Sequence, residues 1–75
     1  MTDTSTEELL QQGFSLQGQH DHVEAIAIFR MILQEDENPS AIGGLAYSQR
    51  ASGDMVSALE SYQRLLKIEP NWAEV

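Results

Sequence analysis

The chain has 75 residues, enough for one small domain, and its formal net charge is −8. This charge argues against nucleic acid and anionic membrane surfaces as partners, because both repel an acidic protein. It is consistent with a basic partner, or with an acidic surface that only keeps the protein soluble. The chain has no cysteine, so it has no disulfide framework, no thiolate metal site and no thiol nucleophile. A reducing, cytoplasmic setting is compatible with that composition and is the expected location.

Residues 1–5 are predicted to be a disordered tail, with no basic or apolar run of the kind that makes a secretory signal. The first helix is expected from Thr6, because Ser5 and Glu8 have the spacing of a capping box. It should end near Gly18, where a glycine and the polar residues after it indicate a turn. Its apolar residues fall on two adjacent faces, and they are Leu9, Gly13 and Leu16, then Leu10 and Phe14.

A second helix is expected after Asp21, which with Glu24 again has the capping-box spacing. The helix must end before Pro39, because the residue preceding a proline is pushed out of the α region. Its apolar stripe consists of Ala25, Ile28, Phe29 and Ile32. The longest apolar run, residues 25–29, is far too short to cross a bilayer, so we expect no membrane insertion.

Two further helices are predicted in the second half of the chain. Asn38 should cap the first of them, with Pro39 at its first position, where a missing N–H has no cost. Asp54 should cap the other, which must end just before Pro70. The residues expected to face the core are Ile42, Leu45 and Ala46, then Ala58, Tyr62, Leu65 and Leu66.

The two halves of the chain repeat each other at an offset of 33 residues, as Ala25 and Ala58 illustrate. Small residues match small ones, and aromatic residues match aromatic ones, as at Phe29 and Tyr62. A period of this length is typical of stacked supersecondary units that cannot bury their apolar faces alone. We therefore predict an all-α fold of two stacked antiparallel helix pairs, residues 6–38 and 39–70, followed by a stub of a further helix or a tail over residues 71–75.

The second unit resembles a tetratricopeptide repeat. The features that match are the large-large-small set Ile42, Leu45 and Ala46, the turn at Gly53-Asp54, and the small, aromatic and proline positions at Ala58, Tyr62 and Pro70. The first unit is similar but degenerate, since Gln12 replaces a large apolar residue, His20 the turn glycine and Glu37 the proline. Gln49 also departs from the pattern, at a position where an aromatic residue is usual. The resemblance implies an α-solenoid fragment.

The resemblance also implies a concave groove, lined by the first helix of each unit, that binds peptides. The positions expected to line this groove are Leu10, Phe14, Gln17, Gly43, Gly44, Tyr47 and Arg50. Phe14 and Tyr47 would be neighbouring aromatic residues, a residue type enriched at interface hot spots. A clamp for a terminal carboxylate is not expected, because the groove lacks the Lys and Asn that such members of the family use.

Two glycines inside the third predicted helix should each cost about 1 kcal/mol relative to alanine. Close approach of a partner backbone to Gly43 and Gly44 is one explanation. The other is that these glycines are merely tolerated while Phe14 and Tyr47 pack against each other.

No catalytic or metal site is predicted. His20, Asp21, His22 and Glu24 form one cluster that could suggest zinc, but two of the four already have roles in a helix cap, and the chain offers no further ligands of the kind structural zinc sites use. No phosphate loop or nucleophile with a base is present, so an enzyme is rejected and no cofactor is expected. Acidic residues 35–37, at an expected helix end, could contact a basic partner or be a solvated helix end.

The sequence thus favours a non-catalytic protein–protein interaction module that binds a peptide or helix in a groove, as an adaptor, assembly factor or co-chaperone. The alternative is a self-associating structural unit, or the terminal segment of a larger repeat protein. That alternative rests on the outer face of the second unit, where Ile42, Leu59 and Leu66 should be partly uncovered and could form a homodimer contact.

Overall fold

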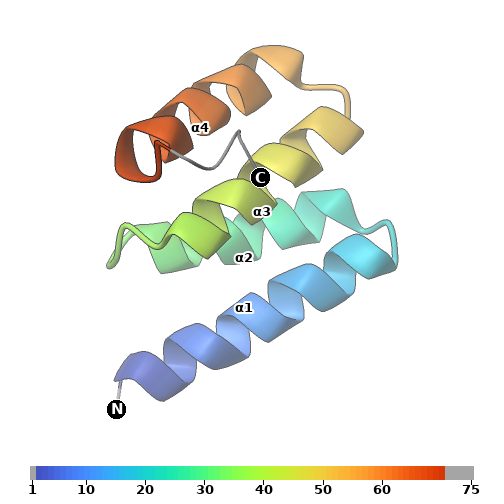
Figure 1. Ribbon diagram of the computed structural model, residues 1–75. Coiled ribbons are helices and arrows are strands. Elements are labelled where there is room, and N and C mark those ends of the chain that lie inside the picture. The colour runs from blue at the N-terminus through green and yellow to red at the C-terminus, as the bar shows by residue number, and fades with distance from the viewer. Residues whose placement is uncertain (1, 71–75) are drawn as a thin grey trace.

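Four α-helices make up the part of the chain that the computed structural model describes, residues 2–70, with side chains from residue 6 onward. The helices are α1 (Thr2–Gly18), α2 (His22–Leu33), α3 (Pro39–Ala51) and α4 (Met55–Ile68). They stack in chain order, as Figure 1 shows, and α3 contacts all three of the others. The predicted all-α fold of two helix pairs is confirmed. The predicted stub over residues 71–75 lies outside the described residues.

The first helix begins at Thr2 rather than at Thr6, so residues 2–5 are helical and not a disordered tail. Ser5 therefore lies inside the helix and is not its N-cap, and the predicted capping box is wrong. Residues 2–6 contain no glycine or proline that would stop the helix. Acidic residues at Asp3, Glu7 and Glu8 also favour the N-terminal end of a helix, where the dipole is positive.

Of the three other predicted N-caps, two form side-chain hydrogen bonds and one does not. Asn38 Oδ1 accepts from the Ala41 N–H at 3.2 Å, with Pro39 at the first helical position, and Asp54 Oδ1 accepts from the Ser57 N–H at 3.2 Å. Asp21 occupies the N-cap position of α2 but makes no side-chain capping bond. The local sequence therefore predicted the start of α2 correctly, but it did not predict which groups accept hydrogen bonds from the first N–H groups of that helix.

The turns between paired helices have the same hydrogen bonds at the 33-residue offset. Asp21 N–H donates to the Leu16 carbonyl at 2.8 Å, and Asp54 N–H donates to the Gln49 carbonyl at 2.8 Å. Both bonds close a Schellman motif, in which one residue adopts positive φ. Gly53 has φ of 96° in the second turn, while His20 has φ of 66° in the first.

Phe29 is the centre of the core. Its fully buried ring lies against Gly13 of α1 on one side and Gly44 of α3 on the other. A methyl group added at either glycine would come within 2.6 Å or 2.5 Å of the Phe29 ring, respectively. The two glycines therefore let three helices meet around one large side chain.

Gln49, where the family pattern has an aromatic residue, forms a buried polar contact between α3 and α4. The Ser61 hydroxyl donates to Gln49 Oε1 at 2.7 Å, and both side chains are buried. The 33-residue equivalents of these two residues are Leu16 and Ile28, which are apolar. The second unit thus uses a hydrogen-bonded pair where the first has an apolar one.

Within the second helix pair, the exposed large aliphatic side chains lie on α4. Leu59 and Leu66 are exposed, as predicted, but Ile42 is completely buried, so its predicted exposure is wrong. The reason is that α3 is packed by α1, α2 and α4, which leaves none of its inward residues uncovered. Within residues 2–70, none of the helices combines the length and hydrophobicity needed to cross a bilayer.

Candidate functional site

A cavity of about 340 Å³ opens where α1 and α3 lie beside each other. Residues of α1 and α3 form most of its wall, and one residue from the end of α4 completes it. The lining residues are Phe14, Gln17, Pro39, Ser40, Gly43, Gly44, Tyr47 and Glu69. We call this cavity the α1–α3 pocket.

Five of the seven predicted groove residues line the α1–α3 pocket, namely Phe14, Gln17, Gly43, Gly44 and Tyr47. Leu10 does not line it, because its half-buried side chain packs against the core cluster around Phe29. Arg50 is exposed near the C-terminal end of α3, one turn beyond Tyr47, and also lies outside the lining set.

Phe14 and Tyr47 are each partly exposed, 43% and 49%, and each is paired with a different aromatic neighbour. Phe14 meets Phe29 edge-on, with ring centroids 5.2 Å apart, and Tyr47 meets His22 edge-on at 6.1 Å. These contacts fix the two rings on the pocket wall while part of each ring stays open to solvent.

Gln17 has a structural role that the sequence did not indicate. Its Nε2 amide donates to the Gly44 carbonyl at 2.6 Å and to the Ser48 hydroxyl at 2.8 Å, which joins α1 to α3. Both N–H donors of that amide are then used. The carbonyl oxygen Oε1 is therefore the part of Gln17 that can meet a ligand.

Gly44 is explained by the protein's own core and not by a partner backbone. The Phe29 ring fills the space that a side chain at Gly44 would occupy. Core packing therefore requires this glycine, so it is not merely tolerated.

Glu69 is the pocket residue that sequence reasoning missed. It lies at the C-cap of α4, far along the chain from the α1 and α3 residues that it joins. Only the return of α4 alongside α3 brings its end to the N-terminal turn of α3, at Pro39 and Ser40. Helical periodicity does not indicate such a residue, because it follows the last turn of α4 and reaches the pocket only through tertiary packing.

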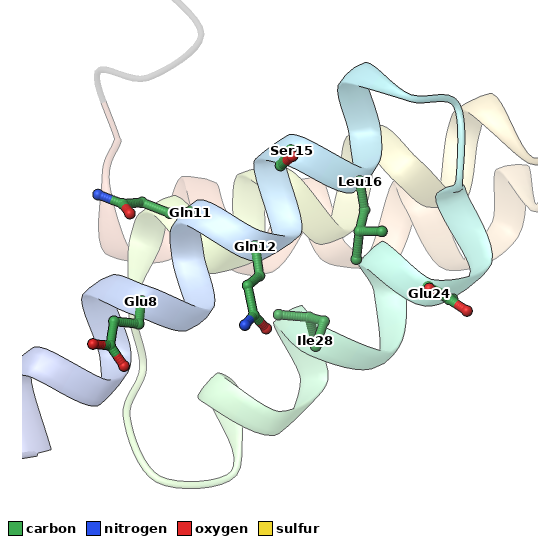
Figure 2. Close-up of a pocket in the computed structure, with 7 residues that line it drawn as sticks. All are labelled: Glu8, Gln11, Gln12, Ser15, Leu16, Glu24 and Ile28. Atoms are coloured by element: carbon green, nitrogen blue, oxygen red, sulfur yellow. The ribbon is translucent and has the colours of Figure 1, made fainter.

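A second cavity, of about 610 Å³, lies between α1 and α2 (Figure 2). Its lining residues are Glu8, Gln11, Gln12, Ser15, Leu16, Glu24 and Ile28. Figure 2 shows Gln12 and Leu16 of α1 pointing toward Ile28 of α2. Gln12 is the residue that replaces a large apolar side chain in the family pattern. Its equivalent, Leu45, is buried in the core, so this wall of α1 is polar where the matching wall of α3 is apolar.

His20 and His22 lie near each other, with ring centroids 6.1 Å apart. Across residues 2–70, however, His, Cys, Asp and Glu side chains form no group of three or more that could hold a metal ion. The histidines instead belong to the turn and the aromatic contacts, since His20 is the positive-φ residue and His22 packs against Tyr47.

Glu37 in the α2–α3 loop forms an ion pair with Arg64 of α4, with 2.9 Å between Oε2 and Nε. The hydrogen bond from Arg64, aided by its positive charge, lowers the pKa of Glu37, and the same contact raises the pKa of Arg64. Glu37 therefore already pairs with a cation of the same chain. This weakens the expectation that residues 35–37 bind a basic partner protein.

Comparison with protein families matches residues 44–71 to the tetratricopeptide repeat model. The second helix pair is therefore similar to a tetratricopeptide repeat. The match begins within α3 and includes α4, which confirms the resemblance of the second helix pair. Such repeats are generally non-catalytic modules for protein–protein interaction. No curated protein and no solved structure gave a significant match.

Proposed function

We propose that the protein is a cytoplasmic, non-catalytic adaptor that binds a peptide or helix of a partner protein along the face formed by α1 and α3. The observation that supports this most directly is the α1–α3 pocket, whose lining includes Phe14 and Tyr47. Pockets of this kind, with apolar walls and a few polar groups, are the usual places where ligands bind. Leu10 and Arg50 would extend the contact beyond the pocket.

The rigidity of this face also supports the proposal. Gln17 ties α1 to α3 through two hydrogen bonds, and Phe29 is held between Gly13 and Gly44 beneath the surface. A surface whose aromatic side chains are already positioned loses little conformational entropy on binding.

Tyr47→Ala tests the proposal. A peptide selected from a random display library on the wild-type protein should lose at least about tenfold in affinity, because exposed aromatic anchors dominate interface energies. Val23→Ala is the matched control, since Val23 is an exposed apolar residue on α2 that does not line the pocket. Equal binding by both variants, with circular dichroism showing both folded, would contradict the proposal.

A second candidate function is self-association, which the apolar face of α4 favours. Met55, Leu59 and Leu66 are exposed at the positions whose 33-residue equivalents on α2 are His22, Ile26 and Leu33, all partly buried. An apolar helix face of this kind is a common protein interface.

A further inference from the structure

The polar groups that line the α1–α3 pocket are mostly hydrogen-bond acceptors. Gln17 offers its carbonyl oxygen, because its two N–H groups are bound to Gly44 and Ser48. Glu69 offers a carboxylate, which when ionised accepts hydrogen bonds and donates none. The hydroxyls of Ser40 and Tyr47 can act either way. A ligand that complements this set must itself be a donor.

The formal charge among the described residues that line the pocket is negative, while the N-terminal turn of α3 at Pro39 and Ser40 adds positive partial charge. Among the described residues that line the pocket, Glu69 is the one ionisable acid or base apart from the phenol of Tyr47, and none of them is a lysine, arginine or histidine. Glu69 also lies at the C-terminal end of α4, where the helix dipole places negative partial charge. With a formal net charge of −8, the whole chain attracts cations toward this site.

The pocket also has surfaces suited to a cation. Phe14 and Tyr47 both line it and are each about half exposed. Aromatic faces attract cations, and they favour the planar guanidinium of arginine, which stacks on a ring while its N–H groups bond elsewhere. The cavity of about 340 Å³ is at the small end for ligand sites, which suits one long side chain.

We infer that the α1–α3 pocket binds an arginine side chain of the partner peptide, with the guanidinium against Tyr47 or Phe14 and its N–H groups on Glu69 and Gln17 Oε1. This inference rests on the proposed function and specifies its ligand. Charge complementarity and the acceptor-rich wall select this occupant over an acidic or purely apolar segment.

The experiment is a random peptide library displayed against the wild-type protein, Tyr47→Ala and Glu69→Gln. Peptides that bind in a Tyr47-dependent way should share an arginine at a fixed position. Glu69→Gln should weaken them roughly two- to fivefold, as for a solvent-accessible ion pair. Glu60→Gln removes the same charge from an exposed glutamate of α4 outside the pocket, and should have a clearly smaller effect.

A double-mutant cycle locates the arginine. If the arginine pairs with Glu69, the losses of binding free energy caused by arginine to glutamine in the peptide and by Glu69→Gln should be less than additive when the two changes are combined. Tyr47-dependent peptides without an enriched arginine, or equal effects of Glu69→Gln and Glu60→Gln, would overturn this inference and leave the proposed function standing. A library that yields no Tyr47-dependent peptide would overturn both.

Discussion

Gly44 shows how a single residue can look functional in the sequence and prove structural in the fold. A glycine inside a helix normally weakens it by about 1 kcal/mol relative to alanine. Here the Phe29 ring would lie 2.5 Å from an added methyl group, so the space itself is needed. The packing requirement outweighs the helical preference.

We therefore expect Gly44→Ala to lower the free energy of unfolding by about 1–3 kcal/mol, the usual cost of overpacking a core. Urea denaturation followed by circular dichroism measures it. Gly18→Ala is the matched control, because an added methyl group there meets nothing within 4 Å, and it should leave stability equal or slightly higher. A stabilising Gly44→Ala would show that Phe29 can move aside.

The two turn residues with positive φ make a second matched pair. Gly53 adopts φ of 96° in open space, so Gly53→Ala should cost about 1 kcal/mol through backbone strain alone. His20 adopts φ of 66° and already bears such strain. His20→Gly should be neutral or stabilising, because relief of strain offsets the greater freedom of the unfolded chain. Thermal unfolding measures both variants: Gly53→Ala should lower the melting temperature, and His20→Gly should leave it unchanged or raise it.

At the scale of elements, the Ser61–Gln49 hydrogen bond joins α3 to α4 within the second helix pair, and it is buried. Ser61→Ala would leave Gln49 Oε1 without its partner, which should cost about 1–3 kcal/mol. Adding Gln49→Leu removes the orphaned group, so the double variant should recover much of that loss. Chemical denaturation of the three variants measures this, and a double variant as unstable as Ser61→Ala would contradict it.

The Glu37–Arg64 ion pair links the α2–α3 loop to α4 and makes one part of the stability depend on pH. Because Arg64 lowers the pKa of Glu37, the folded state favours the ionised carboxyl. Its contribution is present above the ordinary carboxyl pKa and is lost as the pH falls through the lower folded value. The effect should be small, since both side chains are about half exposed.

We expect the melting temperatures of wild type and Arg64→Gln to differ slightly at neutral pH and to converge only as the pH falls below the lowered pKa of Glu37, where its carboxyl becomes protonated. Arg30→Gln removes the same charge from an exposed arginine of α2 and should not show this convergence. A gap between wild type and Arg64→Gln that persists at low pH would mean that Arg64 stabilises the fold by some other contact.

At the scale of the whole molecule, the two ends of the helix stack differ in chemistry. The outer wall of α1 is polar, with Glu8, Gln11, Gln12 and Ser15 around the second cavity, whereas α4 exposes Met55, Val56, Leu59 and Leu66. Polar outer faces are typical of the capping ends of repeat proteins. The polar α1 wall therefore disfavours head-to-tail stacking, and the exposed apolar side chains of α4 are the surface through which the proposed self-association would occur.

If self-association operates, the wild-type protein should show a concentration-dependent mass in sedimentation equilibrium, and Leu59→Glu should return it to a monomer. Gln63→Glu, which adds the same charge at an exposed polar position of α4, is the control. A wild-type protein that is monomeric at all accessible concentrations would rule out this candidate and leave the α1–α3 pocket as the interaction site.

The sequence by itself determined the features that depend on neighbours a few residues away. Caps at Asn38 and Asp54, the helix end before Pro70 and the two equivalent turns all follow from local backbone chemistry. Helical spacing and the family resemblance grouped Phe14, Gln17 and Tyr47 on one face, and in the structure these three residues line the same pocket.

The tertiary structure decided the rest, because it depends on which residues meet across helices. Gly13 and Gly44 gain their role from the same Phe29 ring, Gln17 from a backbone carbonyl 27 positions away, and Glu69 from the return of α4 alongside α3. Helical periodicity gives the face on which a side chain lies. The crossing and offset of the helices, set by how their side chains interlock, decide what that face touches.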